Sequence, residues 1–317
     1  MRLVEPASVR DAAKGLRGVA VRTPLLPSPY LSEVLGHEVR LKCESFQPMG
    51  AFKLRGAYTM LARLTEEQRS RGVITYSSGN HAQAVAYAAR EFGVKAVIVM
   101  PENAPEIKVD GTLRLGGEVV KEGTTSEARR VRAEGIQAER GLTMVPPFDH
   151  PDVIAGQGTV GLEILEDWPD VEVILVPIGG GGLVSGIAAL VKRERPDVRV
   201  VGVEPEGAAA MRRSLEAGRV VTLDSVDSIA DGLLPTRPGD LTFAHCRELV
   251  DDIVLVDDDS IRKAAALLLT RGHLVAEYSG AATTAALLSS AWRNGSVAAV
   301  VSGGNIDVAR IRELLDQ

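Results

Sequence analysis

One lysine stands out among the residues that could do chemistry, because its immediate neighbours are apolar. Lys53 lies between Phe52 and Leu54 in the segment FQPMGAFKLRGAY, residues 46–58. An amine in such surroundings either extends along apolar surface to water or is buried and reactive, and this segment by itself leaves both interpretations open. The other motifs of the chain must decide between them.

A run of four glycines is the second chemical feature. PIGGGGLVSG, residues 177–186, follows an apolar segment that reads as a strand and precedes a helical one. Successive glycines need a reason, since they cost chain entropy. Gly179, Gly180, Gly181 and Gly182 present bare backbone amides at a helix start, which is typical of a phosphate site, whereas a flexible turn is the alternative. The run is neither a Walker loop nor a dinucleotide fingerprint.

Small polar residues follow another predicted strand. YSSGNHAQAVAYAA, residues 76–89, places Ser78, Gly79, Asn80 and His81 at the start of a helix. Hydroxyl, amide and free N–H groups that converge there suit a carboxylate, although an ordinary helix cap explains them as well.

Two further strand ends carry single polar groups. Ser302, in VVSGGNID (300–307), could form one hydrogen bond with a ring nitrogen, or it belongs to another turn. Glu204, in VGVEPEGAAAM (201–211), ends an apolar run. A lone carboxylate at such a place is more often a helix cap or an ion-pair partner than a metal ligand.

Taken together, these motifs favour one cofactor. A lysine, a phosphate site, a carboxylate site and a hydroxyl all fall at predicted strand ends, where α/β sheets bind their ligands. A phosphate beside a reactive lysine indicates pyridoxal 5′-phosphate (PLP), whose aldehyde forms a Schiff base with lysine and whose ring accepts electrons.

Strands and helices that alternate along the chain must position these groups. β-branched runs that are nearly all apolar predict strands buried on both faces, and the segments between them are helical, so we expect an α/β fold with parallel sheets. TEEQ, at 65–68, is a capping box. The predicted strands are 38–43, 72–77, 95–100, 118–122, 142–147, 171–178, 198–204, 252–257 and 297–303; the predicted helices include 52–64, 81–92, 106–115, 125–139, 182–194, 258–271 and 279–293.

Prolines mark the best candidate for a domain boundary. VPPFDHPD, residues 145–152, interrupts the alternation. We therefore expect a large cofactor-binding domain from residues 1–71 and 151–317, and a small substrate-binding domain from residues 72–150.

Composition excludes several classes of protein. The 317 residues are 45% hydrophobic and carry a net charge of −6 (36 basic minus 42 acidic) without a basic block, so nucleic acid and anionic membranes are not expected partners. Aromatic content is 4%, and no window is apolar enough to span a bilayer. Two distant cysteines, Cys43 and Cys246, and a charged N-terminal segment without a signal-peptide pattern are consistent with the cytoplasm.

At this point the sequence resembles a known family over nearly its whole length. It is similar to the fold-type II PLP enzymes, which have two open, twisted, mostly parallel sheets flanked by helices, and within them to threonine dehydratases (threonine ammonia-lyases). The matching motifs appear in the expected order: ESFQPMGAFKLRGAY, SSGNHAQAVA, VPPFDHPDVIAGQGT, GGGGL, GVEPE, AEYSGA and SGGN.

The resemblance assigns roles residue by residue. Lys53 would form the Schiff base and later act as the base, Phe52 would pack near the cofactor ring, and Asn80 would bind its phenolic oxygen. Ser302 would meet the pyridine nitrogen. The phosphate would be held by the backbone amides of Gly179, Gly180, Gly181, Gly182 and Leu183. The substrate carboxylate would be received by Ser78, Gly79, Asn80 and His81, and Ser78 would be the second acid/base group that a racemase needs.

The sequence departs from the family pattern at several places. Ala51 replaces a serine, Met49 replaces a small or polar residue, and Tyr278 replaces a proline. Glu204 and the Ala208 carbonyl match a divalent-cation site, but Ala210 stands where a second carboxylate is expected, so a Mg²⁺ or Ca²⁺ site is the weaker interpretation. The chain ends 12 residues after Asn305, so no C-terminal regulatory domain and no feedback by isoleucine are expected.

The resemblance implies a PLP-dependent carbon-nitrogen lyase that acts on L-threonine and L-serine and assembles as a homodimer or homotetramer. Three alternatives stay open: a dehydratase for another β-hydroxy amino acid such as hydroxyaspartate or phenylserine, a serine racemase, and a phosphometabolite-binding protein without catalysis. The last explains the glycines but leaves Lys53 without a role. A β-replacement enzyme fits the lysine segment less well.

Overall fold

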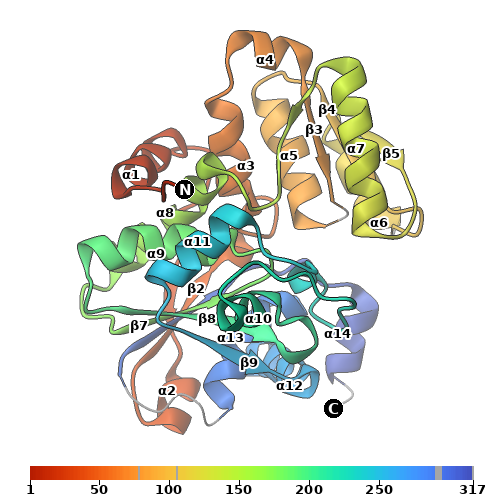
Figure 1. Ribbon diagram of the computed structural model, residues 1–317. Coiled ribbons are helices and arrows are strands. Elements are labelled where there is room, and N and C mark those ends of the chain that lie inside the picture. The colour runs from red at the N-terminus through yellow and green to blue at the C-terminus, as the bar shows by residue number, and fades with distance from the viewer. Residues whose placement is uncertain (78, 105, 290–294, 316–317) are drawn as a thin grey trace.

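Two sheets organise the chain, as Figure 1 shows. The computed structural model describes residues 1–77, 79–104, 106–289 and 295–315. The larger sheet has six strands in the order β1-β2-β10-β7-β8-β9, and all its neighbouring pairs are parallel except β1–β2. Its strands are β1 (Leu25–Pro27), β2 (Val39–Cys43), β7 (Val173–Pro177), β8 (Arg199–Pro205), β9 (Asp252–Val256) and β10 (Val297–Val301).

The smaller sheet is parallel throughout and has the order β5-β4-β3-β6. Its strands lie consecutively in the chain between residues 73 and 144: β3 (Val73–Tyr76), β4 (Ala96–Met100), β5 (Glu118–Lys121) and β6 (Thr143–Met144). Each predicted strand segment therefore contains a strand, and the expected α/β fold with two mostly parallel sheets is confirmed.

Helices cover both faces of each sheet. On the larger sheet, α12 and α13 share one hydrophobic core with the strands, whereas α8, α9 and α11 share the other. On the smaller sheet, α5 packs against one face and α7 against the opposite one. The helices are α1 (Pro6–Gly15), α2 (Pro29–Leu35), α3 (Lys53–Ala62), α4 (Glu66–Arg71), α5 (Asn80–Glu91), α6 (Glu106–Arg114), α7 (Ser126–Arg140), α8 (Pro151–Asp167), α9 (Gly182–Glu194), α10 (Ala210–Ala217), α11 (Asp240–Leu249), α12 (Asp258–Thr270), α13 (Tyr278–Leu288) and α14 (Val308–Leu315).

The segment 145–150 leads the chain from the smaller sheet back to the larger one, between β6 and α8. The core of the smaller sheet also includes Ala57, Met60 and Leu61 of α3, which precede the boundary expected at residue 72. The division into domains at residues 72 and 150 stays a prediction. The capping box predicted at Thr65 is present, since Thr65 and Gln68 exchange side-chain and backbone hydrogen bonds.

The central helix α8 is glycine-rich because its neighbours come very close. A Cβ on Gly156 would lie 2.4 Å from the carbonyl oxygen of Arg55, and one on Gly158 would lie 2.6 Å from that of Gly186. Such distances exclude a side chain, so glycine lets α8 pack tightly against both α3 and α9.

A buried ionic cluster joins β2, α3 and α8. The guanidinium of Arg55 donates hydrogen bonds to Glu44, at 2.8 Å, and to Glu163, at 2.7 Å. Lys42 donates to Glu163 at 2.6 Å. Lys42, Glu44 and Arg55 are almost completely buried. Two cations thus balance two anions, which is the condition for charges to be tolerated away from water.

Among the described residues, no helix combines the length and the apolar character needed to cross a membrane. Cys43 and Cys246 are both buried and free. Burial raises the pKa of each thiol to about 12, so neither is a ready nucleophile.

Candidate active site

Lys53 is the first residue of α3 and lies against the end of β10. The N–H of Phe52 donates a hydrogen bond of 3.1 Å to the carbonyl of Ser302, and the N–H of Gly304 donates one of 2.9 Å to the carbonyl of Gly50. Gly50 has a φ of 68°, which favours glycine and turns the chain into the helix. Residues about 250 positions apart in sequence are thereby fixed side by side.

The side chain of Lys53 is half-buried, and its amine is held by two neighbouring groups. Its Nζ donates a 2.8 Å hydrogen bond to the carbonyl of Pro147 and lies 5.1 Å from the centre of the Phe52 ring. Burial lowers the pKa of this amine to about 8, although the nearby Glu277 carboxylate opposes the shift. A large fraction of the amine is therefore neutral near physiological pH, which is the form that attacks an aldehyde or accepts a proton.

The four glycines form the turn from β7 into α9. Gly181 is the N-cap residue of α9 with a φ of 95°, and Gly180, Gly181, Gly182 and Leu183 are buried. In the part of the chain that the structure describes, no backbone or side-chain acceptor bonds the N–H groups of residues 179–183. Buried donors normally have acceptors, so a row without them at a helix N-terminus fits an anionic group.

Close packing around this turn excludes side chains from it. A Cβ on Gly180 would lie 2.2 Å from the ring of Phe148, and one on Gly181 would lie 2.7 Å from the terminal methyl of Met211. The glycines are therefore required by their neighbours as well as by their own geometry.

Asn80 begins α5, and its side-chain amide has two hydrogen-bond partners, an acceptor for its nitrogen and a donor for its oxygen. Its Nδ2 donates to Oε1 of Glu277 at 2.7 Å, and its Oδ1 accepts from Nδ2 of Asn305 at 2.8 Å. Burial raises the pKa of Glu277 to about 7, with the carboxylate of Asp231 adding to the effect. One N–H of Asn80 stays available for a further acceptor.

The predicted carboxylate site is at the start of α5. Gly79, Asn80 and His81 are described there. The N–H of Gly79 donates to the hydroxyl of Ser77 at 3.4 Å, whereas the backbone N–H groups of Asn80 and His81 have no acceptor among the described residues, which leave out the neighbouring Ser78. The ring of His81 is buried and its Nε2 lies 3.0 Å from the carbonyl of Val145. Burial lowers the pKa of His81 to about 3, so this ring is neutral and only its backbone N–H suits a carboxylate. The role predicted for Ser78 falls outside the described residues.

Ser302 is buried directly after β10, and its hydroxyl has no hydrogen-bond partner among the described residues. Its carbonyl is the one that holds Phe52. A free hydroxyl at this place is consistent with a ligand that carries a ring nitrogen.

Glu204 lies at the end of β8, where it caps α10. Its two carboxylate oxygens accept hydrogen bonds of 2.8 Å from the N–H groups of Met211 and Arg212. Burial raises the pKa of Glu204 to about 7. The residues that the structure describes contain no group of three or more His, Cys, Asp or Glu that could hold a metal. The cation site at Glu204 and Ala208 stays a prediction, and capping is the role with a visible partner.

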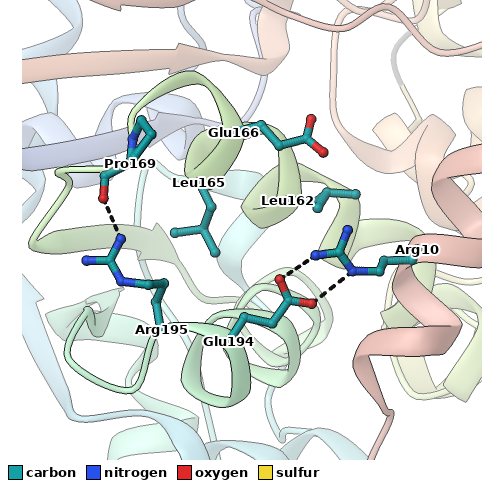
Figure 2. Close-up of a pocket in the computed structure, with 7 residues that line it drawn as sticks. All are labelled: Arg10, Leu162, Leu165, Glu166, Pro169, Glu194 and Arg195. Carbon is teal, nitrogen blue, oxygen red and sulfur yellow. Dashed lines mark hydrogen bonds and ion pairs between the residues drawn. The ribbon is translucent and has the colours of Figure 1, made fainter.

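A surface depression of about 310 Å³ lies away from these residues, among α1, α8 and α9 (Figure 2). Its charged side chains have partners, since Arg10 is paired with Glu194 and Arg195 donates to the carbonyl of Pro169. None of the predicted site residues lines it.

Comparison with known proteins decides the family. Residues 16–303 match the model of the family described as "Pyridoxal-phosphate dependent enzyme". The chain belongs to this family of PLP-dependent enzymes. It is 46% identical to the L-threonine ammonia-lyase of Thermotoga maritima over 98% of this chain and 77% of that protein. It is 42% identical to a serine racemase of Oryza sativa, over 97% and 93%.

A solved structure of maize serine racemase superposes on this PLP-dependent enzyme with a TM-score of 0.94. The identity is 39%, and the match covers 99% of this chain and 98% of that chain. The resemblance to threonine dehydratases and serine racemases that the motifs indicated is thus confirmed, together with fold-type II architecture.

The residues present fit the cofactor of this family. Lys53 offers a partly neutral amine, residues 180–183 offer buried N–H groups without acceptors among the described residues, and Ser302 offers a free hydroxyl. The glycine run and Ser302 lie at the carboxyl ends of β7 and β10, and Lys53 begins α3, the α-helix that follows β2. The individual roles of the site residues remain proposals.

Sequence reasoning missed several residues of this PLP-dependent enzyme's candidate site. Pro147 supplies a carbonyl and Phe148 a ring, neither of which has a local signal. Glu277 and Asn305 hold Asn80 from far along the chain. Glu277 and Asn305 do lie within motifs that carried the resemblance, AEYSGA and SGGN, which was the one signal that could have found them.

Proposed function

We propose that this enzyme is an ammonia-lyase that converts L-threonine to 2-oxobutanoate and ammonia, and L-serine to pyruvate and ammonia. The observation that carries the proposal is the amine of Lys53, which has a pKa of about 8 and no carboxylate within hydrogen-bonding distance among the described residues. A neutral amine can receive the proton on the α-carbon of an amino acid. The threonine ammonia-lyase of Thermotoga maritima, 46% identical, supports the reaction type.

PLP, when bound, supplies an aldehyde for the substrate amino group and a conjugated ring that accepts electron density. Lys53 would then accept the α-proton, and the β-hydroxyl would leave the substrate together with a proton, as water. The 2-amino-enoic acid that results rearranges and reacts with water to give the 2-oxo acid and ammonia. Two hydrogen bonds orient Lys53. Its helix is joined to the end of β10 through Phe52, and its amine donates to the carbonyl of Pro147.

The start of α5 would receive the substrate carboxylate. The backbone N–H groups of Asn80 and His81 and the partial positive charge of the helix N-terminus suit an anion. Because the His81 ring is neutral, its contribution is the backbone donor and the contact with Val145 that fixes the turn.

Ser302 would face the ring nitrogen of the cofactor. A neutral hydroxyl leaves that nitrogen less cationic than a carboxylate partner would. Charge left on the substrate is then less stabilised, which favours prompt loss of the β-hydroxyl over longer-lived alternatives.

Serine racemisation is the second candidate, because the rice and maize relatives are serine racemases with comparable identity. The two activities differ in the product. A racemase returns the proton to the opposite face of the α-carbon, and Ser78 would be that donor. Hydroxyaspartate and phenylserine remain further candidates for the substrate.

The test is a panel assay that measures 2-oxo acid, ammonia and amino-acid configuration for L- and D-threonine, serine, hydroxyaspartate and phenylserine. The proposal expects 2-oxo acid from L-threonine and L-serine in the wild type and none in Lys53→Ala. D-serine as the main product would favour the racemase. Borohydride should attach the cofactor to Lys53; a wild type that binds PLP without such trapping would support a binding protein.

We also propose a homodimer or homotetramer in the cytoplasm. The two free, buried thiols suit a reducing compartment. Light scattering of the purified protein measures the assembly state.

A further inference from the structure

A threonine that lies outside the motifs of the sequence analysis forms a hydrogen bond to the glycine turn. Thr242 lies in the first turn of α11 and is completely buried. Its hydroxyl donates a 2.6 Å hydrogen bond to the carbonyl of Gly180, and the carbonyl of Gly239 lies farther away, at 3.2 Å. A hydroxyl has one proton, so the shorter contact to Gly180 takes it.

This bond fixes the direction of a neighbouring donor. The carbonyl of Gly180 and the N–H of Gly181 belong to the same planar trans peptide, in which they point in opposite directions. Because Thr242 holds the carbonyl on one side, the N–H of Gly181 is directed to the other side of the turn. That N–H is among the buried donors without an acceptor in the described chain.

Packing leaves the turn little freedom to rotate away. A Cβ on Gly181 would lie 2.9 Å from Cβ of Thr242, so the threonine is in contact with the turn itself. The other donor to the Gly180 carbonyl is the N–H of Gly239 at 3.5 Å, which is at the weak limit for a hydrogen bond. Thr242 therefore makes the stronger bond.

Asp149 in turn fixes Thr242. Its carboxylate accepts hydrogen bonds from the N–H groups of Asp240, Leu241 and Thr242, all between 3.0 and 3.1 Å. These are the donors that a helix start leaves free, so Asp149 caps α11 from the segment between β6 and α8. A Cβ on Gly239 would lie 2.1 Å from this carboxylate, which shows how closely the cap is packed.

We infer that Thr242 is a positioning residue for the cofactor phosphate: its hydroxyl holds the Gly180–Gly181 peptide so that the Gly181 N–H faces the bound anion, and Asp149 holds Thr242. This inference rests on the proposed seat of the phosphate at residues 179–183. Thr242 contacts the turn through its hydroxyl, so the effect assigned to it passes through one backbone donor. Removing the hydroxyl then weakens the contribution of the phosphate to binding and leaves the contribution of the aldehyde and ring unchanged.

The experiment compares two ligands that differ only in the phosphate. Apoprotein of the wild type and of Thr242→Val is titrated with PLP and with pyridoxal, and dissociation constants are measured from absorbance. We expect Thr242→Val to weaken PLP about tenfold, the scale of one lost hydrogen bond, and to leave pyridoxal unchanged. Thr242→Ser retains the hydroxyl and should bind PLP nearly as the wild type does. The ³¹P resonance of bound PLP should shift in Thr242→Val and not in Thr242→Ser.

A matched control removes a comparable hydroxyl elsewhere. Thr283 is also a buried helix threonine and donates a 3.0 Å hydrogen bond to the carbonyl of Val300. Thr283→Val should change the affinities for PLP and pyridoxal by the same factor. Should Thr242→Val not fold, Thr242→Ala is the second variant without the hydroxyl, and it carries the same expectation.

The outcomes separate the inference from the function on which it rests. Unchanged PLP affinity in the hydroxyl-free variants, or an equal loss for PLP and pyridoxal, overturns the role of Thr242 while the enzyme proposal stands. A wild-type apoprotein that binds neither ligand overturns the proposed function and the inference with it.

Discussion

The side-chain nitrogen of Asn80 lies 2.7 Å from Oε1 of Glu277, and the side-chain oxygen of the same amide accepts a hydrogen bond from Asn305. An acceptor on one side and a donor on the other allow only one orientation of the amide. Asn80 thus reaches the site with its remaining N–H already directed, although the two residues that direct it lie about 200 positions further along the chain.

Asn305→Ala tests this orientation. The substitution removes the donor to Asn80, together with the hydrogen bond of the same amide to the carbonyl of Met49, but little buried surface, because Asn305 is exposed. We expect kcat/KM for L-threonine to fall about tenfold, equivalent to about 1.4 kcal/mol, with the melting temperature nearly unchanged. Steady-state kinetics and thermal unfolding measure both. Gln68→Ala is the control: it removes an amide from the capping box of α4, so it should lower the melting temperature and leave kcat/KM unchanged. Equal kinetics in Asn305→Ala and the wild type would contradict the prediction.

The pH dependence of cofactor capture tests the state of Lys53. Burial lowers the pKa of its amine from 10.5 to about 8. The reactive neutral form therefore grows about tenfold per pH unit below this pKa and is complete above it. We expect the rate at which apoprotein forms its imine with PLP to rise up to about pH 8 and then to level off, as followed by stopped-flow absorbance. A rate that keeps rising to the pKa of an ordinary lysine would show that the amine is solvated.

Gly180→Ala places a methyl group where the Phe148 ring lies, 2.2 Å away. Overpacking of this kind costs about 1–3 kcal/mol, so PLP affinity should fall by about tenfold or more. Phe148→Ala in the same chain should recover part of the loss, because it removes the obstructing ring. Gly135→Ala is the control: its Cβ would meet nothing within 4 Å, so it should leave PLP binding intact. Failure of Phe148→Ala to relieve Gly180→Ala would show that the clash is not the cause.

Arg55→Met should destabilise the fold strongly. It leaves the carboxylate of Glu44 buried without its cation, which costs about 3–5 kcal/mol of unfolding free energy. Urea denaturation measures the loss. Because the pKa of Glu44 is lowered in the folded state, chiefly by Arg55 against the cost of burial, the stabilisation is present above the ordinary glutamate pKa and is lost as the pH falls through the folded value.

Two comparisons make the Arg55 experiment specific. Arg55→Met combined with Glu44→Gln should be less damaging than the two single effects added, because no unpaired charge remains at that carboxylate. Arg140→Met removes an exposed pair with Glu118 and should cost at most about 1 kcal/mol. A loss in Arg55→Met no larger than in Arg140→Met would refute the account of the cluster.

Glu204→Ala separates capping from cation binding. Loss of the cap to α10 should cost about 0.5–2 kcal/mol of unfolding free energy in buffer with EDTA. If Glu204 also binds Mg²⁺ or Ca²⁺, addition of the ion raises the melting temperature of the wild type and leaves that of the variant unchanged. Capping alone predicts no dependence on the ion in either protein.

The sequence predicted most of the strands, because nearly continuous β-branched runs are typical of strands buried on both faces. It did not indicate β1, since Leu25–Pro27 is three residues long and ends in proline. It also did not indicate α8, which contains Gly156, Gly158 and Gly161, and glycine has a low helix propensity. In the folded protein Gly156 and Gly158 are required by neighbouring backbone, a relationship that no local pattern contains.

Some residues of the candidate site could be predicted from the sequence and others could not. Lys53 and the glycine run were found because their residue types are unusual for their surroundings. Thr242 and Asp149 have ordinary local contexts, and only the tertiary structure brings them behind the glycine turn.

The short connection 145–150 has a consequence for how this chain can vary. Its residues supply a carbonyl to Lys53, a ring to Gly180 and a cap to α11, all within three consecutive positions. An inserted or deleted residue there would shift every one of these partners at once. Changes of length and circular permutation should therefore be tolerated at distant surface turns but not in segment 145–150. The length of this connection between the two sheets is fixed by the contacts that its residues make.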